Sequence, residues 1–67
     1  MEKILLVSEF QQLVHRATAI GYRRVHLEDG KIAYRGEYGG FVVDSMNYYG
    51  AVSFRASTSA CFALGIY

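Results

Sequence analysis

Cysteine is almost absent from this sequence, in which Cys61 is the one such residue among 67. One cysteine excludes an internal disulfide and a zinc site built from several cysteines. Small chains without disulfides are typical of the reducing cytosol, so we expect a cytoplasmic protein. Cys61 lies in the apolar segment SACFAL, which indicates a buried and unreactive thiol rather than a nucleophile.

A long apolar run and an excess of one charge are also missing. The opening MEKILLV has four consecutive apolar residues, too few for a signal peptide, and no run approaches the roughly 18 that cross a bilayer. We therefore expect no membrane association. Seven Lys and Arg against six Asp and Glu give a net charge of +1, without the basic excess of a general nucleic-acid binder.

Motifs for catalysis, metal binding and cofactor binding are absent as well. The glycines fall between expected strands, not in a phosphate-binding loop that joins a strand to a helix. His15 and His26 are expected on the polar sides of different elements, so with Cys61 they make a poor metal site and a poor catalytic pair. The sequence therefore predicts a protein that is not an enzyme and has no cofactor or metal.

Apolar residues, by contrast, are abundant and make up 52% of the chain. A domain of this size buries only about 60% of its surface on folding, so some apolar side chains remain outside. We expect residues 1–67 to form a single small domain whose exposed apolar surface is covered by another protein or by a second copy. The simplest self-association is a twofold homodimer.

The clearest element is a helix in SEFQQLVHRATAIG. Ser8 and Gln11 form a capping-box pair, and Gly21 follows where a left-handed C-cap lies. We therefore expect a helix from about Glu9 to Ile20, preceded by a short buried strand in KILLV. The residues that share its apolar face are Phe10, Leu13, Val14, Ala17 and Ile20.

The segment YRRVHLEDGKIAYRGE is typical of a hairpin with Asp29 and Gly30 at its tip, because this dipeptide tolerates the positive φ of a two-residue turn. The register that follows places Arg24 opposite Arg35. It also predicts one face toward the core and one face outward. The core-facing residues are Val25, Leu27, Ile32 and Tyr34, and the outward ones are Arg24, His26, Glu28, Lys31 and Arg35.

Two further strands follow. A glycine turn leads to FVVDS, which places Asp44 opposite Arg35, and the turn NYYG leads to AVSFRA. Two structures are possible for residues 57–67: a short helix capped by Ser57, or a final strand. The weak helix propensity of Ser, Thr, Cys and Phe favours the strand. The whole predicts an α+β fold, with one amphipathic helix packed on an antiparallel sheet of roughly four to six strands. The inward residues are Phe41, Val43, Val52 and Phe54, and the outward ones are Ser53 and Arg55.

The outward sheet face is the first candidate site. Arg24 and Arg35 repel each other unless an anion lies beside them, and Asp44 in the next strand is an internal counterion. Two interpretations are open: neutralisation by Asp44, or binding of an external anion with the help of Arg55. Single-stranded RNA or DNA is one such ligand, because arginines and aromatic rings hold unstacked bases. A nucleotide-sized anion is a further candidate.

The segment MNYYG is the second candidate site. Met46, Tyr48 and Tyr49 exceed what so small a core can hold, although packing of one tyrosine is the simpler alternative. Tyr and Arg dominate protein interfaces, and a protein partner tolerates mixed charge. The sequence therefore predicts a non-catalytic module that binds a larger protein as an inhibitor, adaptor or regulator. Such roles are common among phage and mobile-element proteins. The expected partner-binding residues are Tyr48, Tyr49, Met46, Arg24, Arg35 and Arg55, with nucleic-acid binding as the alternative.

Overall fold

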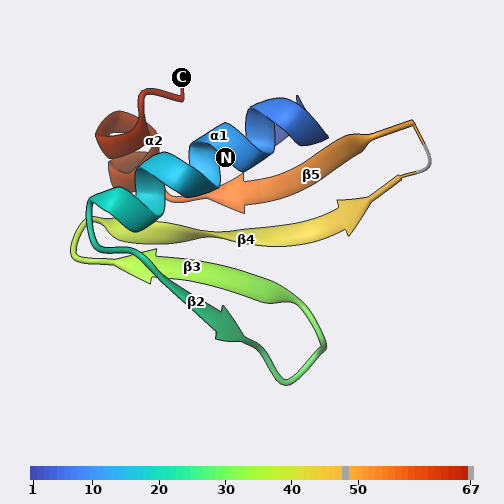
Figure 1. Cartoon of the computed structure of the whole chain (residues 1–67). Coiled ribbons are helices and arrows are strands. Elements are labelled where there is room, and N and C mark those ends of the chain that lie inside the picture. The colour runs from blue at the N-terminus through green and yellow to red at the C-terminus, as the bar shows by residue number, and fades with distance from the viewer. Residues whose placement is uncertain (48, 67) are drawn as a thin grey trace.

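The computed structural model describes residues 1–47 and 49–66, which form two helices and five strands (Figure 1). In chain order the elements are β1 (Glu2–Leu6), α1 (Val7–Ala19), β2 (Arg23–His26), β3 (Ile32–Gly36), β4 (Gly39–Met46), β5 (Ala51–Ala56) and α2 (Thr58–Leu64). The strands make one antiparallel sheet in the order β1-β5-β4-β3-β2. The predicted α+β fold, with a helix packed on an antiparallel sheet, is confirmed.

The sheet is a meander with one added strand. β2, β3, β4 and β5 pair in chain order, whereas β1 pairs with β5 at the opposite edge from β2. Both helices share one hydrophobic core with a single face of the sheet, which we call the helix face. The other face, which we call the open face, carries no described helix (Figure 1). Neither described helix combines the length and the apolar character that a membrane span needs.

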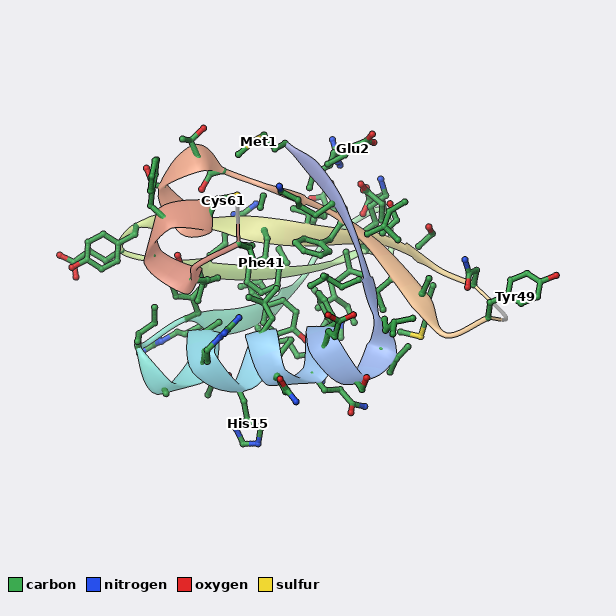
Figure 2. The ribbon with its side chains drawn as sticks, turned by 90° about the horizontal axis from the view of Figure 1, so that it is seen from above. Met1, Glu2, His15, Phe41, Tyr49 and Cys61 are labelled. Carbon is green, nitrogen blue, oxygen red and sulfur yellow. The ribbon has the colours of Figure 1, made fainter. Side chains whose placement is uncertain are left out.

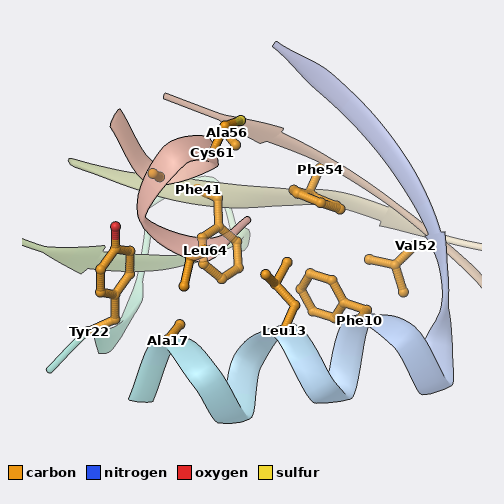
Figure 3. Close-up of a cluster of buried hydrophobic side chains, with 11 residues drawn as sticks. Phe10, Leu13, Ala17, Tyr22, Phe41, Val52, Phe54, Ala56, Cys61 and Leu64 are labelled. Atoms are coloured by element: carbon orange, nitrogen blue, oxygen red, sulfur yellow. The ribbon is translucent and has the colours of Figure 1, made fainter. Parts of the chain in front are cut away.

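The core lies between the helix face and the two helices (Figure 3). The ring centroids of Phe10 and Phe54 lie 5.3 Å apart, and the Phe41 ring stacks on Tyr34 at 4.9 Å. Ile20, predicted on the apolar face of the helix, is 50% exposed because α1 ends before it. The buried core residues are Phe10, Leu13, Ala17, Tyr22, Phe41, Val52, Phe54, Ala56, Ala60, Cys61 and Leu64.

α1 follows β1 without a loop. Leu6 is the last residue of β1 and the N-cap of α1, and its amide donates to Oε1 of Glu9 at 3.4 Å. The Val7 amide donates to the Gly50 carbonyl at 2.6 Å, which ties the start of the helix to the β4–β5 turn. The predicted cap at Ser8 is therefore wrong, because Glu9 takes the role expected of the capping glutamine and the helix begins earlier.

The tip of the β2–β3 hairpin is a loop one residue longer than the predicted turn. The Leu27 amide donates to the Lys31 carbonyl at 2.9 Å, so residues 28–30 lie outside the ladder. Gly30 has a φ of +86°, the left-handed conformation that ends this type of three-residue loop. The Asp29 carboxylate accepts from the Lys31 amide at 3.0 Å. Asp29 and Gly30 are thus turn residues as predicted, in a different turn.

The extra loop residue shifts the register of β2 by one residue and exchanges its faces. Arg24 lies opposite Tyr34 on the helix face, whereas Arg23 lies opposite Arg35 on the open face. Val25, predicted to face the core, is on the open face and 37% exposed. The predicted alternation is therefore wrong in β2, but it is confirmed in the other three strands of the meander. Their inward residues are Ile32, Tyr34, Phe41, Val43, Val52 and Phe54.

The segment after β5 forms α2, so the favoured strand is wrong and the alternative helix is right. Ser57 Oγ accepts from the Ala60 amide at 3.1 Å, and Gly65 ends the helix with a φ of +71°. These two caps outweigh the weak helix propensity of the residues between them. Leu64 and Cys61 are buried in the core, the latter as predicted.

Candidate binding groove

The arginines of the first predicted site lie on different parts of the surface. Arg24 is on the helix face, and Arg35 is on the open face opposite Arg23. Arg55 is also on the open face, but β4 separates its strand from that of Arg35. The structure therefore brings together Arg23 and Arg35 rather than Arg24 and Arg35, and the continuous arginine face expected from the sequence is not formed.

Asp44 neutralises Arg55 rather than Arg35. Its carboxylate accepts from Nε of Arg55 at 2.9 Å and from Nζ of Lys31 at 3.1 Å. Partial burial acts to raise the pKa of Asp44, but the hydrogen bonds and charges of Arg55 and Lys31 outweigh it and hold this pKa below its usual value. The expected internal counterion is thus engaged elsewhere, and the described residues give Arg23 and Arg35 no carboxylate partner.

The β4–β5 hairpin carries the second predicted site. Asn47 Oδ1 accepts from the amides of Tyr49 and Ala51, at 2.9 and 3.1 Å, so its side chain orders the turn. The turn presents Tyr49 with 89% of its surface exposed and Met46 with 65%. Figure 2 shows Tyr49 at the far end of the hairpin, away from the core. Tyr48, the third residue of this predicted site, lies outside the described residues.

The helices cover only part of the helix face. α1 packs on β1 and β5, and α2 packs on β4, whereas every residue of β2 is exposed. Figure 1 shows β2 and much of β3 beyond the helical layer. Strands lie about 4.8 Å apart, so the outer two of five are roughly 19 Å apart, while a helix is about 10 Å wide. The sheet therefore has room for one more long helix beside α1.

An open apolar groove runs along α1 on this uncovered side, with a volume of about 580 Å³. Val14 of α1 and Tyr34 of β3 are half-buried in its walls, and Met46 joins them from the end of β4. The groove is therefore a place where apolar side chains of a second molecule can be buried. Its apolar lining residues are Val7, Phe10, Val14, Tyr34, Met46 and Val52.

The margins of the groove are polar, and no Asp or Glu is found among the described residues that line it. On the α1 side the margin includes His15, which Figure 2 shows pointing away from the sheet. On the sheet side, Arg24 and His26 of β2 lie on the helix face beside β3. His26 was predicted on the outward face, and the register shift moves it together with Arg24. The groove thus has an apolar interior with polar residues of α1 at one side, and Arg24 of β2 lies on the same face of the sheet, opposite the groove residue Tyr34.

Catalytic and metal-binding groups are not clustered in the part of the chain that the structure describes. Cys61 is buried, and no three His, Cys, Asp or Glu residues come close enough to hold a metal ion. The Tyr22 hydroxyl is buried without a hydrogen-bond partner among residues 1–47 and 49–66, and burial, assisted by Tyr38, raises its pKa. A higher pKa means that less of the phenolate, the nucleophilic form, is present at neutral pH.

The apolar pattern of the sequence predicts Phe10, Val14 and Tyr34 as core residues but does not show which element covers them, so it does not predict the groove. One signal was present in the sequence. A single long helix is too narrow to cover an antiparallel sheet of the expected width, so part of the helix face had to remain uncovered.

The features that bear on function are the apolar interior of the groove, the position of Arg24 beside Tyr34, and the exposed tip of the β4–β5 hairpin. Comparison of the chain with protein family models, with curated proteins and with solved structures finds no match in any of the three.

Proposed function

We propose that the protein is a small non-catalytic module that binds another protein through the groove beside α1. The groove itself carries the proposal, because it is open, apolar and bounded by sheet that no described helix covers. Met46 at its margin and Tyr49 at the hairpin tip extend the exposed apolar surface, and such side chains are enriched in protein interfaces. A module of this kind acts as an inhibitor, an adaptor or a regulator by occupying the surface of its partner, as small phage-encoded proteins do.

The test is capture of a partner from the native cell lysate after nuclease treatment, followed by affinity measurements with the purified partner. Tyr49→Ala is expected to weaken binding by about 2 kcal/mol, roughly 30-fold, as loss of an aromatic anchor does. Met46→Ser is expected to weaken it by less. Ile20→Ser is the matched control, because Ile20 is an equally apolar, half-exposed residue that does not line the groove. Equal losses in all three variants would contradict the proposal.

Binding of single-stranded RNA or DNA is the second candidate. The β2–β3 hairpin carries Arg23, Arg24 and Arg35, for which the described residues provide no carboxylate partner. Their placement on both faces prevents all three from following one path of the phosphate backbone. This candidate predicts that Arg24→Ala and Arg35→Ala weaken binding, with about one log unit of affinity lost per tenfold rise in salt for each phosphate contacted. We expect instead a shallow salt dependence.

Self-association is proposed on a different surface. Ile4 and Leu6 of β1 lie on the open face and are 72% and 56% exposed. A twofold pairing of two copies through this region would cover both side chains. Light scattering at micromolar concentration is then expected to report about twice the chain mass of 7.5 kDa. A monomer at every concentration would refute the dimer and leave the groove proposal intact.

A further inference from the structure

We infer that the partner segment seated in the groove is an amphipathic α-helix with acidic residues along the flank that faces β2. This inference rests on the proposed function, because it names the occupant of the same groove. The dimensions of the uncovered sheet, the chemistry of the groove walls and the charge of β2 support it, each independently of the others.

The groove has the dimensions of one helix. α1 forms its long wall, and 13 residues with a rise of about 1.5 Å each give roughly 20 Å. Packed helices lie about 8–10 Å apart, which is the width that two strands of a sheet cover. A partner helix beside α1 would therefore occupy the space above β3 and β2 and would join α1 and α2 on the helix face.

A helix suits these walls better than an extended segment. The lining consists of side chains such as Val14 and Tyr34, which offer no row of backbone amides and carbonyls. An extended chain would bury unpaired backbone groups there, whereas a helix pairs its own. The nearby edge strand β2 is short and carries Arg23 and Arg24, and charged side chains on an edge oppose the addition of a strand.

The charge of β2 determines which flank of that helix is acidic. Arg24 lies on the helix face, and the described residues bring no carboxylate into an ion pair with it. His26 lies on the same face, and Asp44 is held in ion pairs with other cations. A helix whose apolar stripe contacts Val14 and Tyr34 therefore presents one flank to an unneutralised arginine. Asp and Glu are the side chains that complement it.

Selection from a displayed peptide library tests the inference. Each peptide of about 14 residues keeps an apolar stripe at helical spacing, while the positions on both flanks vary among Asp, Glu, Lys, Arg, Ser and Gln. We expect selected peptides to carry Asp or Glu on one flank and to gain helical circular dichroism on binding. Peptides without a charge preference, peptides with Lys or Arg on that flank, or failure to select any peptide would overturn the inference.

Charge reversal at two arginines of one hairpin provides the matched control. Arg24→Glu, on the helix face, is expected to weaken the selected peptides about five- to tenfold, because an attraction becomes a repulsion. Arg35→Glu makes the same change on the open face and is expected to alter the Kd by less than about twofold. Replacing the acidic residues of the peptide with Lys is expected to restore affinity for Arg24→Glu. Equal effects of the two reversals, or no restoration, would contradict an acidic flank beside β2.

The two proposals fail in different ways. A purified lysate partner that loses affinity on Met46→Ser or Tyr49→Ala, together with a selection that shows no acidic preference, overturns the helix inference and retains the protein-binding module. A partner whose affinity is unchanged by both substitutions overturns the proposal that binding occurs through the groove and the hairpin tip. Both arginine variants change exposed side chains, so circular dichroism is expected to show that they fold.

Discussion

The two halves of the helix face, one under α1 and the other beyond it, share one hydrogen-bonded sheet but differ in what their side chains contact. Val52 and Phe54 of β5 have no exposed surface, whereas all four residues of β2 are exposed. The difference follows from connectivity. Because α1 begins at the last residue of β1 without a loop, the helix is held near the β1 edge and leaves the β2 edge uncovered.

This difference separates the surface that stabilises the fold from the surface that we propose for binding. Apolar burial in the covered half supplies the free energy that holds this small domain together. The uncovered half leaves the inward side chains of β3, Ile32 and Tyr34, only partly buried, which costs stability but keeps a groove open. Substitutions in the first half should therefore change the free energy of unfolding, and substitutions in the second should change affinity.

The largest expected effect is in the covered half. Phe54→Ala removes a fully buried ring and is expected to lower the free energy of unfolding by about 3–5 kcal/mol. Ile32→Ala, at a half-buried position of the uncovered half, is expected to cost only about 1 kcal/mol. Urea denaturation of both variants measures the contrast. Equal losses would show that the two halves are buried to the same extent in solution.

Substitution of Gly30, in the uncovered half, tests whether the two halves unfold together. Gly30→Val forces a β-branched residue to a φ of +86° and is expected to cost roughly 1–3 kcal/mol, whereas Gly30→Asn, which tolerates this conformation, costs less. The melting temperature of the whole domain is expected to fall if the halves are cooperative. An unchanged melting temperature would mean that the hairpin opens by itself.

Tyr22, where the chain passes from α1 to the uncovered β2, provides a prediction of opposite sign. Its ring covers Gly36, where no side chain fits, but its buried hydroxyl has no described hydrogen-bond partner. Tyr22→Phe is therefore expected to stabilise the protein by about 1 kcal/mol. Tyr38→Phe, at a half-exposed ring, is the control and is expected to change little. Destabilisation by Tyr22→Phe would reveal a partner for the hydroxyl, such as an ordered water.

The smallest expected effect concerns the ion pairs that link the two halves across the open face. Although partial burial acts to raise it, the folded-state pKa of Asp44 lies below the ordinary value of 3.8 because of Arg55 and Lys31, so these ion pairs stabilise the fold at pH values above 3.8. This contribution is lost as the pH falls through the lowered pKa of the folded state. The stability difference between the native protein and Asp44→Asn, measured in urea, is therefore expected to shrink from pH 7 to the most acidic pH accessible. A constant difference would contradict it.

Strand alternation was predictable wherever hydrophobic pattern alone decides the faces, as for Phe41 and Phe54. It was not predictable in β2, because Asp29 and Gly30 fit both a two-residue and a three-residue loop, and a difference of one residue exchanges the faces. That exchange moved Arg24 from the open face to the helix face, beside the groove residue Tyr34, so one local ambiguity changed the candidate site.

The caps of α2 are visible in the sequence as Ser57 and Gly65, and these two positions outweigh the low average helix propensity of the residues between them. The groove is a different case. It depends on where α1 lies on the sheet, which is set by the missing loop after Leu6 and by packing against β5. Packing of this kind is a tertiary property that no local pattern encodes.

The strand order also has a consequence for how the chain folds. β2 to β5 pair with neighbours in the sequence, whereas Glu2 of β1 pairs with Arg55 of β5 near the other end of the chain. Pairing of β1 with β5 closes a long loop, which is slow. Phe10 of α1 also packs on β5, at Phe54, so docking of the helix involves the same strand. We therefore expect helix docking and β1 pairing to form one rate-limiting event. We expect substitutions in α1 and β5 to slow folding, which corresponds to high φ-values in a kinetic mutational analysis. Substitutions in β2 are expected to have low φ-values, so they speed unfolding without slowing folding.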